Sequence, residues 1–147
     1  MPRLILSLLP LLVFTLVTPN AQDAPVLTAT LSGHTLPVND LDFSDDGTLL
    51  ASASDDLTAR LWEVPAFTEV AVLEGQLNHV RSVDLAPDGN TLLTTGFNGI
   101  AFLWDVRSQT RASSVNEPRY PSMSDGAFAP DGETFAVALG SGQVQLY

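Results

Sequence analysis

The sequence contains no cysteine and no lysine, and its six arginines stand against 17 acidic residues, which gives a formal net charge of −11. Without cysteine the chain cannot form a disulfide framework or a thiolate zinc site. A strongly acidic chain also lacks the basic surface that nonspecific nucleic-acid binding or docking on anionic lipid requires. We therefore expect no nucleic-acid partner.

Long hydrophobic runs are scarce as well. The longest largely apolar stretch, residues 4–17, has 14 residues, whereas a bilayer span needs about 20. It follows Arg3, the only charge in the first 22 residues, and this pattern is typical of a secretory signal peptide, here cleaved after Ala21. The alternatives are an uncleaved membrane anchor and a buried core helix, which Pro10 disfavours. We predict a signal segment over 1–21, export to the periplasm or the extracellular space, and no stable membrane span.

The rest of the chain repeats itself with a period of 42 to 43 residues. A shift of 42 places Trp62 on Trp104, and a further shift of 43 places Trp104 on Tyr147. Repeats of this length indicate an architecture in which each copy forms one supersecondary unit. The predicted mature chain, residues 22–147, divides into copies at residues 31–64, 73–106 and 115–147.

Within each copy the apolar residues follow a period of two, which predicts strands rather than helices. A turn at Ser44–Thr48 in the first copy corresponds to Pro-Asp-Gly turns at residues 87–89 and 130–132 in the others. In such turns proline presets φ and glycine accepts a left-handed conformation. The pattern predicts an all-β chain with about four short antiparallel strands per copy.

Several landmarks at the correct mutual spacing make the chain resemble the WD40 repeat family. They are Gly33-His34, the turn ending at Gly47, Trp62-Glu63 and, in the second copy, Trp104-Asp105. The resemblance implies a segment of a β-propeller with about three four-stranded blades. It also implies a scaffold that binds a protein or peptide partner and has no catalysis of its own. The alternative function is a propeller-based hydrolase or lyase that acts outside the cytoplasm.

His34, Ser52 and Asp56 are the residue types of a hydrolase triad. The resemblance implies instead that they join Trp62 in a structural network of hydrogen bonds. The second copy favours this interpretation, because amides and a hydroxyl replace the first three groups there and cannot act as a general base near neutral pH. The corresponding residues are Gln76, Thr94, Asn98 and Trp104.

The third copy should be the weakest of the three. The positions that correspond to the network are occupied there by Arg119, Val137, Ser141 and Tyr147. This set cannot reproduce the linked hydrogen bonds of the first copy. We expect the network to be largely lost and this blade to be the least stable.

The sequence offers only weak candidates for a metal site. Residues 42–47 imitate the start of a calcium-binding loop, but Ala53 stands at the twelfth position, which should be a bidentate glutamate. The two histidines, His34 and His79, occupy unrelated positions of the repeat, and no glycine-rich phosphate loop precedes a helix. We expect no metal and no cofactor.

A partner is expected on the face of the ring where loops and strand ends are displayed. By analogy with the family, the candidate partner-binding residues are Pro37, Asn39, Asp55, His79, Arg81 and Phe97. An exposed phenylalanine beside arginine and histidine suits a binding hot spot. Alternatively, Phe97 packs against the next blade.

Three blades are too few for a closed ring, which needs at least four. Residues 26–31 are predicted to form an outer strand ahead of the first copy, and the third copy lacks a fourth strand. These two pieces complement each other. Either the sequence is a piece of a larger propeller, or two chains exchange outer strands and close a six-bladed ring.

Overall fold

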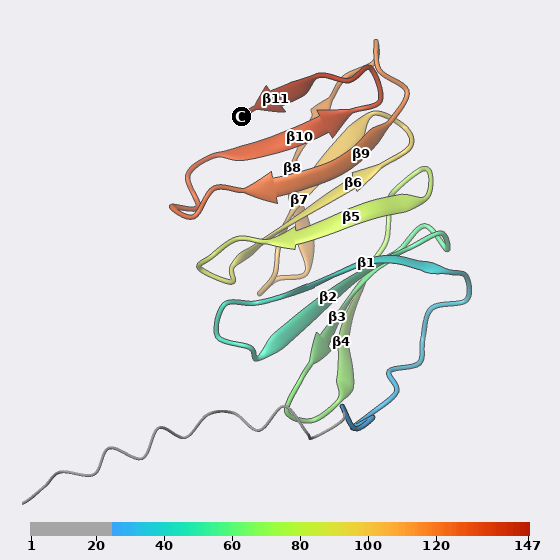
Figure 1. Ribbon diagram of the computed structural model, residues 1–147, viewed down its shortest axis with the longest axis vertical. Helices are drawn as coiled ribbons and strands as arrows, with labels where there is room; N and C mark the ends of the chain where they lie inside the picture. The colour runs from blue at the N-terminus through green and yellow to red at the C-terminus, as the bar shows by residue number, and fades with distance from the viewer. Residues whose placement is uncertain (1–24) are drawn as a thin grey trace, which may run out of the picture.

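The computed structural model describes residues 25–147, so the predicted signal segment at 1–21 lies outside the described residues. The described part contains eleven strands and no helix (Figure 1). The first four are β1 (Val38–Phe43), β2 (Leu49–Ser54), β3 (Ala59–Glu63) and β4 (Thr68–Leu73). The next four are β5 (Val80–Leu85), β6 (Thr91–Gly96), β7 (Ile100–Asp105) and β8 (Thr110–Asn116). The last three are β9 (Met123–Phe128), β10 (Phe135–Leu139) and β11 (Val144–Leu146).

The strands form three separate antiparallel sheets, one for each copy of the repeat. The sheets have the orders β1-β2-β3-β4, β5-β6-β7-β8 and β9-β10-β11, so each strand pairs with its neighbour in the chain. Figure 1 shows the sheets stacked, with β1, β5 and β9 side by side along one edge. This confirms the predicted all-β fold of propeller blades, and we call the sheets blades 1, 2 and 3.

The turns between the first two strands of each blade share one conformation. Gly47, Gly89 and Gly132 have φ of 69°, 68° and 71°, in the left-handed region that glycine adopts without strain. Each of these glycines donates its N–H to the carbonyl three residues earlier, at 2.8 to 2.9 Å. The predicted turn chemistry is therefore present three times.

The hydrophobic core lies between the blades, and alternation along each strand divides it into two layers. Leu92 belongs to the cluster between blades 1 and 2, while its neighbour Leu93 belongs to the cluster between blades 2 and 3. Both side chains are fully buried. Successive residues of a strand point to opposite faces, so blade 2 is apolar on both sides. Burial of each leucine contributes about 1.5–3 kcal/mol relative to an exposed position.

The outer strand predicted over residues 26–31 is not formed. Residues 25–37 have no strand, and the side chains of Val26 and Leu27 are more than 80% exposed. A strand needs a neighbouring strand to satisfy its backbone groups, and this segment pairs with none; it lies beside the side chains of Phe43 and Leu50 of blade 1. Blade 3 accordingly has three strands.

Candidate functional site

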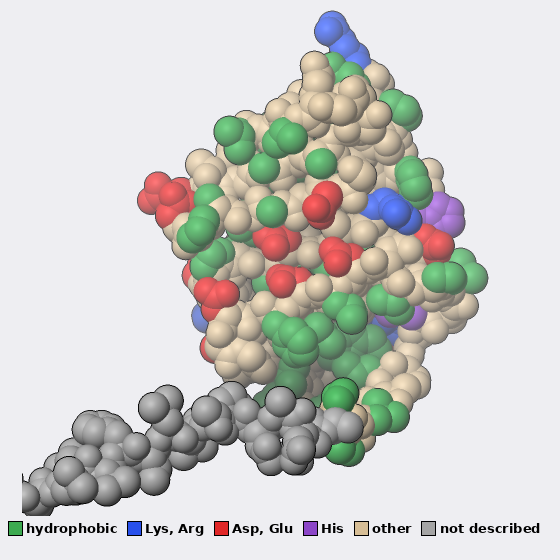
Figure 2. Space-filling view, viewed as in Figure 1, with side chains coloured by type: hydrophobic (Ala, Val, Ile, Leu, Met, Phe, Trp, Pro, Cys, Tyr) green, Lys and Arg blue, Asp and Glu red, His purple; other side chains and the backbone are tan. Residues whose placement is uncertain are grey.

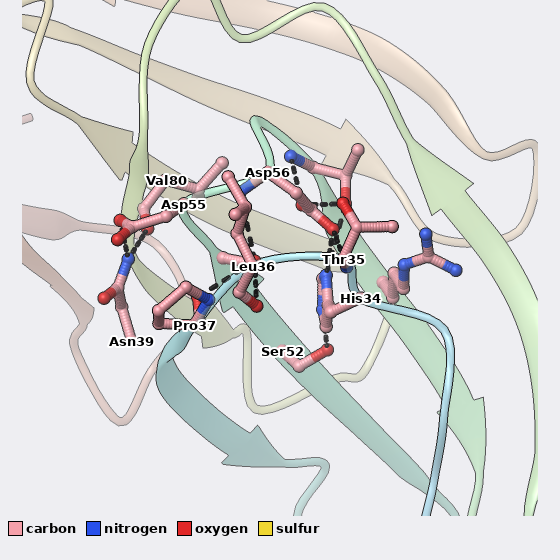
Figure 3. A network of polar contacts seen from close by, with 12 residues as sticks. His34, Thr35, Leu36, Pro37, Asn39, Ser52, Asp55, Asp56 and Val80 are labelled. Carbon is pink, nitrogen blue, oxygen red and sulfur yellow. Dashed lines mark hydrogen bonds and ion pairs between the residues drawn. The ribbon is translucent and has the colours of Figure 1, made fainter.

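The network predicted in blade 1 is present as a continuous chain of hydrogen bonds. His34 Nδ1 lies 2.9 Å from Asp56 Oδ2, and His34 Nε2 lies 2.8 Å from Ser52 Oγ (Figure 3). The indole N–H of Trp62 donates to the same Ser52 oxygen at 2.8 Å. These bonds tie the entry loop to β2 and β3, because each residue comes from a different segment.

The carboxylate of Asp56 closes this chain at the turn between β2 and β3. Burial raises the pKa of Asp56, but hydrogen bonds from the Thr58 hydroxyl, the His34 ring and the N–H groups of Thr35 and Thr58 outweigh burial and hold the pKa well below its usual range. The Thr58 hydroxyl donates to Asp56 Oδ1 at 2.6 Å, and the Thr35 N–H donates to Oδ2 at 3.0 Å. Asp56 is therefore an ionised acceptor at neutral pH.

The arrangement matches a serine–histidine–aspartate triad in connectivity but not in accessibility. An ionised Asp56 accepts the Nδ1 proton of His34, which leaves Nε2 free to accept the Ser52 hydroxyl proton. Ser52 is only 2% exposed, however, and its oxygen is already occupied by the Trp62 N–H. A nucleophile must reach its substrate, and Ser52 is almost completely buried.

The second network joins three of the four predicted residues. Gln76 Nε2 donates to Thr94 Oγ1 at 2.7 Å, and Trp104 Nε1 donates to the same oxygen at 3.0 Å. Among the described residues, the amide of Asn98 and the Oε1 of Gln76 have no hydrogen-bond partner. Asn98 thus does not take the part predicted for it. In blade 1 the imidazole of His34 has two separate ring nitrogens, and each reaches a different partner. In blade 2 the amide of Gln76 carries both polar atoms on one carbon, so it bonds to Thr94 without also reaching Asn98.

Blade 3 has no equivalent chain of bonds. Val137 is fully buried but has no polar group, and Arg119 and Ser141 are exposed. Tyr147 stacks on Phe135 with ring centroids 5.4 Å apart, and its hydroxyl bonds to Glu117 at 3.0 Å. An aromatic stack takes the place of the polar network.

The six candidate partner-binding residues lie together where blade 1 meets blade 2, and we call this group the rim. Asn39 Nδ2 donates to Asp55 Oδ1 and to the Val80 carbonyl, both at 2.8 Å (Figure 3). The Pro37 carbonyl accepts the N–H of Asp55 at 3.0 Å. His79 Nδ1 lies 3.1 Å from Asp55 Oδ1. Contacts between blade 1 and blade 2 therefore hold the rim together.

Phe97 forms the exposed tip of the rim. The guanidinium of Arg81 lies 5.0 Å from the centre of its ring, and His79 meets the ring edge-on at 6.1 Å. Both partners belong to blade 2, and 44% of Phe97 remains exposed. The described contacts thus place Phe97 on its own blade, with an open face toward solvent.

A second polar feature, which the sequence interpretation missed, joins the inner strands of successive blades. Asp40 and Asp42 of β1 accept the N–H groups of Val83 and Leu85 of β5, at 3.0 and 2.6 Å. Asp84 of β5 accepts the N–H of Phe128 of β9 at 2.6 Å. Figure 2 shows acidic side chains gathered over this part of the molecule. We call these three aspartates the aspartate ladder; the repeat shift that places Asp42 on Asp84 is the signal that would have revealed it.

Asp84 is the most perturbed group of the ladder. Burial raises its pKa, and the nearby charges of Asp42, Asp125 and Asp40 raise it further, against the lowering effect of the Phe128 N–H. The resulting pKa is about 6. A carboxyl group that is both half-buried and surrounded by like charges holds its proton more tightly than in water.

The candidate calcium loop is closed by its own side chains. Ser44 Oγ donates to Asp46 Oδ1 at 2.7 Å, and the Thr48 N–H donates to the same oxygen at 2.9 Å. Across residues 25–147, His, Asp and Glu form no group of three that could hold a metal ion. The same residues include no helix that could serve as a membrane span.

Stacked antiparallel sheets, inner strands in contact and, in two of them, a tryptophan N–H that donates to a buried hydroxyl define a β-propeller segment built from sequence repeats. The sequence model of the family described as "WD domain, G-beta repeat" matches residues 25–63 and 67–105, more than half of the chain. The protein belongs to the WD40 family. WD40 repeats imply a scaffold for protein–protein interaction, and members of the family are typically not catalytic.

A segment of the chain is similar to protein Mut11 of Chlamydomonas reinhardtii. The two sequences are 52% identical over 46 residues, which are 31% of this chain and 12% of Mut11. The similarity thus covers about one repeat and a small part of the relative.

Proposed function

We propose that the protein is a non-catalytic scaffold that binds a protein or peptide partner through the rim. The observation that carries this proposal is the exposed Phe97 ring, held between Arg81 and His79 at the junction of two blades. Aromatic and arginine side chains dominate the energetics of protein interfaces. The rim presents both on one rigid surface.

The rim is already ordered before a partner arrives. Asn39 bridges Asp55 of its own blade and the Val80 carbonyl of the next blade, so hydrogen bonds join the two halves of the rim. A preorganised surface loses little conformational entropy on binding. This supports recognition by a fixed face rather than by a loop that folds on contact.

Burial argues against a catalytic function for the network in blade 1. Ser52 is almost fully buried, and its hydroxyl donates toward His34 and accepts from Trp62, so its proton and one of its lone pairs are used within the blade. In blade 2 the corresponding hydroxyl, Thr94, faces Gln76, which cannot accept a proton near neutral pH. The common property of the two sites is hydrogen bonding to an indole, which is a structural function.

We also propose that the protein acts outside the cytoplasm. The support is the apolar stretch at 4–17 behind Arg3, which has the length of the hydrophobic core of a signal peptide and is too short for a membrane span. Fractionation of expressing cells, with N-terminal sequencing of the product, tests this. Export with a new N-terminus near Gln22 is the expected result, and an intact cytoplasmic chain would contradict it.

The rim is tested by a double substitution, Arg81→Ala with Phe97→Ala. A partner is first isolated on the unaltered protein, and its affinity is then measured by titration. We expect affinity to fall at least tenfold while the melting temperature stays within a few degrees, because Phe97 is exposed.

The matched control is Arg107→Ala with Phe67→Ala, which removes the same two side-chain types from exposed turns outside the rim. This variant should bind as the unaltered protein does. Equal losses in both variants, or unfolding of the rim variant alone, would contradict the proposal.

A further inference from the structure

Arg81 is a cation of the rim that the described part of the chain does not pair with an anion. Its guanidinium appears in none of the ion pairs and none of the side-chain hydrogen bonds formed within residues 25–147; its contact is with the ring of Phe97. A guanidinium is a permanent cation with five N–H donors in a rigid plane. Arg81 therefore offers unused donors and an uncompensated positive charge.

Phe97 holds this guanidinium in place. The central carbon of the Arg81 guanidinium lies 5.0 Å from the centre of the phenyl ring, a distance at which the ring attracts a cation. A cation–π contact needs no hydrogen-bond acceptor. The contact thus restricts the position of the Arg81 side chain without using up its N–H groups.

Phe97 is itself fixed by its neighbours. Its backbone N–H donates to the His79 carbonyl at 3.4 Å, and the His79 ring meets the phenyl ring edge-on. The carboxylate of the rim, Asp55, is engaged by His79 at 3.1 Å and by the amide of Asn39 at 2.8 Å. These contacts occupy Asp55 with groups other than Arg81, so the rim does not neutralise its own cation.

A second stack of the same kind shows that packing does not explain the first. The guanidinium of Arg111 lies 4.8 Å from the centre of the Phe102 ring. Phe102 belongs to the core between blades 1 and 2 and is only 4% exposed, so Arg111 covers a buried side chain. Phe97 is 44% exposed and belongs to neither core cluster. The stack of Arg81 on Phe97 therefore forms a surface and not the cover of a core.

We propose that Arg81 binds a carboxylate of the partner and that an apolar side chain beside this carboxylate packs on Phe97. The inference rests on the proposed binding at the rim and adds the chemistry of the partner. A guanidinium and a carboxylate form two parallel N–H···O bonds, which fix the orientation as well as the charge. The partner is thus a protein segment in which an aspartate or glutamate stands next to an apolar residue.

The charge around Arg81 favours a carboxylate over a phosphoryl group. A phosphoryl group carries a charge of about −1.5 to −2, and clusters of arginines usually bind it. The rim contains one arginine, which lies on a chain of net charge −11 and on the same surface as Asp55. One negative charge is neutralised by Arg81, whereas a second would be repelled.

The first test selects peptides from a random peptide library on the full chain and keeps those that fail to bind Phe97→Ala. These are the rim-binding peptides. We expect aspartate or glutamate to be enriched in them next to an apolar residue. Selection on Arg81→Glu should replace the acidic preference with lysine or arginine, because the charge at the site is reversed. Arg111→Glu is the matched control and should select acidic peptides as the unaltered protein does.

The second test measures the affinity of one selected peptide by titration. Arg81→Ala should weaken binding about tenfold or more, and Arg81→Lys should also weaken it, since an ammonium group cannot form the bidentate pair. A peptide with glutamine in place of its glutamate should bind as weakly to the unaltered protein as the original peptide binds to Arg81→Ala. It should lose little more on Arg81→Ala, because the two changes remove the same contact. The glutamine arm needs no altered protein, so it stands even if an Arg81 variant fails to fold.

The outcomes separate this inference from the function on which it rests. Rim-binding peptides without an acidic residue, or an acidic preference that persists in Arg81→Glu, would overturn the carboxylate and leave the rim as the binding surface. Tighter binding when phosphoserine replaces the glutamate would also overturn it, in favour of a phosphoryl group. If no peptide depends on Phe97, both the rim and the inference are overturned.

Discussion

Blades 1 and 3 share one repeat pattern but stabilise it by different means. In blade 1 a histidine, a serine, an aspartate and a tryptophan link the entry loop to two strands, and in blade 3 a tyrosine stacks on a phenylalanine at the surface. Blade 2 is intermediate, with three linked residues and an unpaired Asn98. The comparison teaches that the strand pattern alone specifies a sheet, while the buried bonds specify how firmly its loops are attached.

The largest expected difference in stability is between variants that remove the tryptophan of blade 1 or the corresponding tyrosine of blade 3. Trp62→Ala should lower the free energy of unfolding by about 3–5 kcal/mol, because it leaves a cavity and removes a hydrogen bond from Ser52. Tyr147→Ala should cost about 1 kcal/mol, since it loses mainly a half-exposed stack. Urea unfolding of both variants measures the two values, and similar losses would contradict the comparison.

A smaller effect should follow from giving blade 2 the polar residues of blade 1. Gln76→His with Asn98→Asp places an imidazole between Thr94 and a carboxylate. We expect a gain of about 0.5–1.5 kcal/mol in the free energy of unfolding, the usual net value of a hydrogen bond that satisfies a buried group. Each single substitution should give less than the pair, which a double-mutant cycle detects. Loss of stability in the pair would show that Asn98 is not an incomplete version of Asp56.

The smallest effect is the dependence of stability on pH. Folding raises the pKa of Asp84 from 3.8 to about 6, so the folded chain binds this proton more tightly than the unfolded chain does. The contribution of Asp84 to stability therefore increases as pH falls from 7 through 6 toward 4. Asp56 has the opposite sign: its lowered pKa contributes stability that is present above about pH 4 and is lost in more acidic solution.

Urea midpoints measured between pH 4.5 and 7.5 test the Asp84 contribution. We expect the increase toward low pH to disappear in Asp84→Asn, whereas Asp45→Asn, in an exposed turn, should keep it. An unchanged slope in Asp84→Asn would contradict the assignment.

Much of the fold followed from local pattern. The four short antiparallel strands predicted per copy are present in blades 1 and 2, and the left-handed glycines stand in the predicted turns, because alternation and turn chemistry act over a few residues. The strand predicted at 26–31 was wrong because a strand also needs an edge to pair with, which is a property of distant parts of the molecule.

The candidate site likewise contains residues that the sequence predicted and contacts that it did not predict. The residue types of the network and of the rim could be read from the repeat, since equivalent positions lie in equivalent places. The repeat aligns Asp42 with Asp84 and so marks the position of the aspartate ladder, but it does not reveal the partners of these carboxylates, because they accept from backbone N–H groups of the next blade. The missing hydrogen bond at Asn98 depends on the distance that an amide would have to span, and the residue type does not reveal that distance.

Substitution of Ser52 tests the central claim, that the buried polar network is a structural element. In Ser52→Ala the Trp62 N–H and the His34 ring lose their shared partner while they remain buried. We predict that urea unfolding will show a loss of about 1–3 kcal/mol, with rim binding retained, whereas the exposed Ser114→Ala will change neither. An unfolding curve identical to that of the unaltered protein, together with loss of an enzymatic activity, would contradict the account.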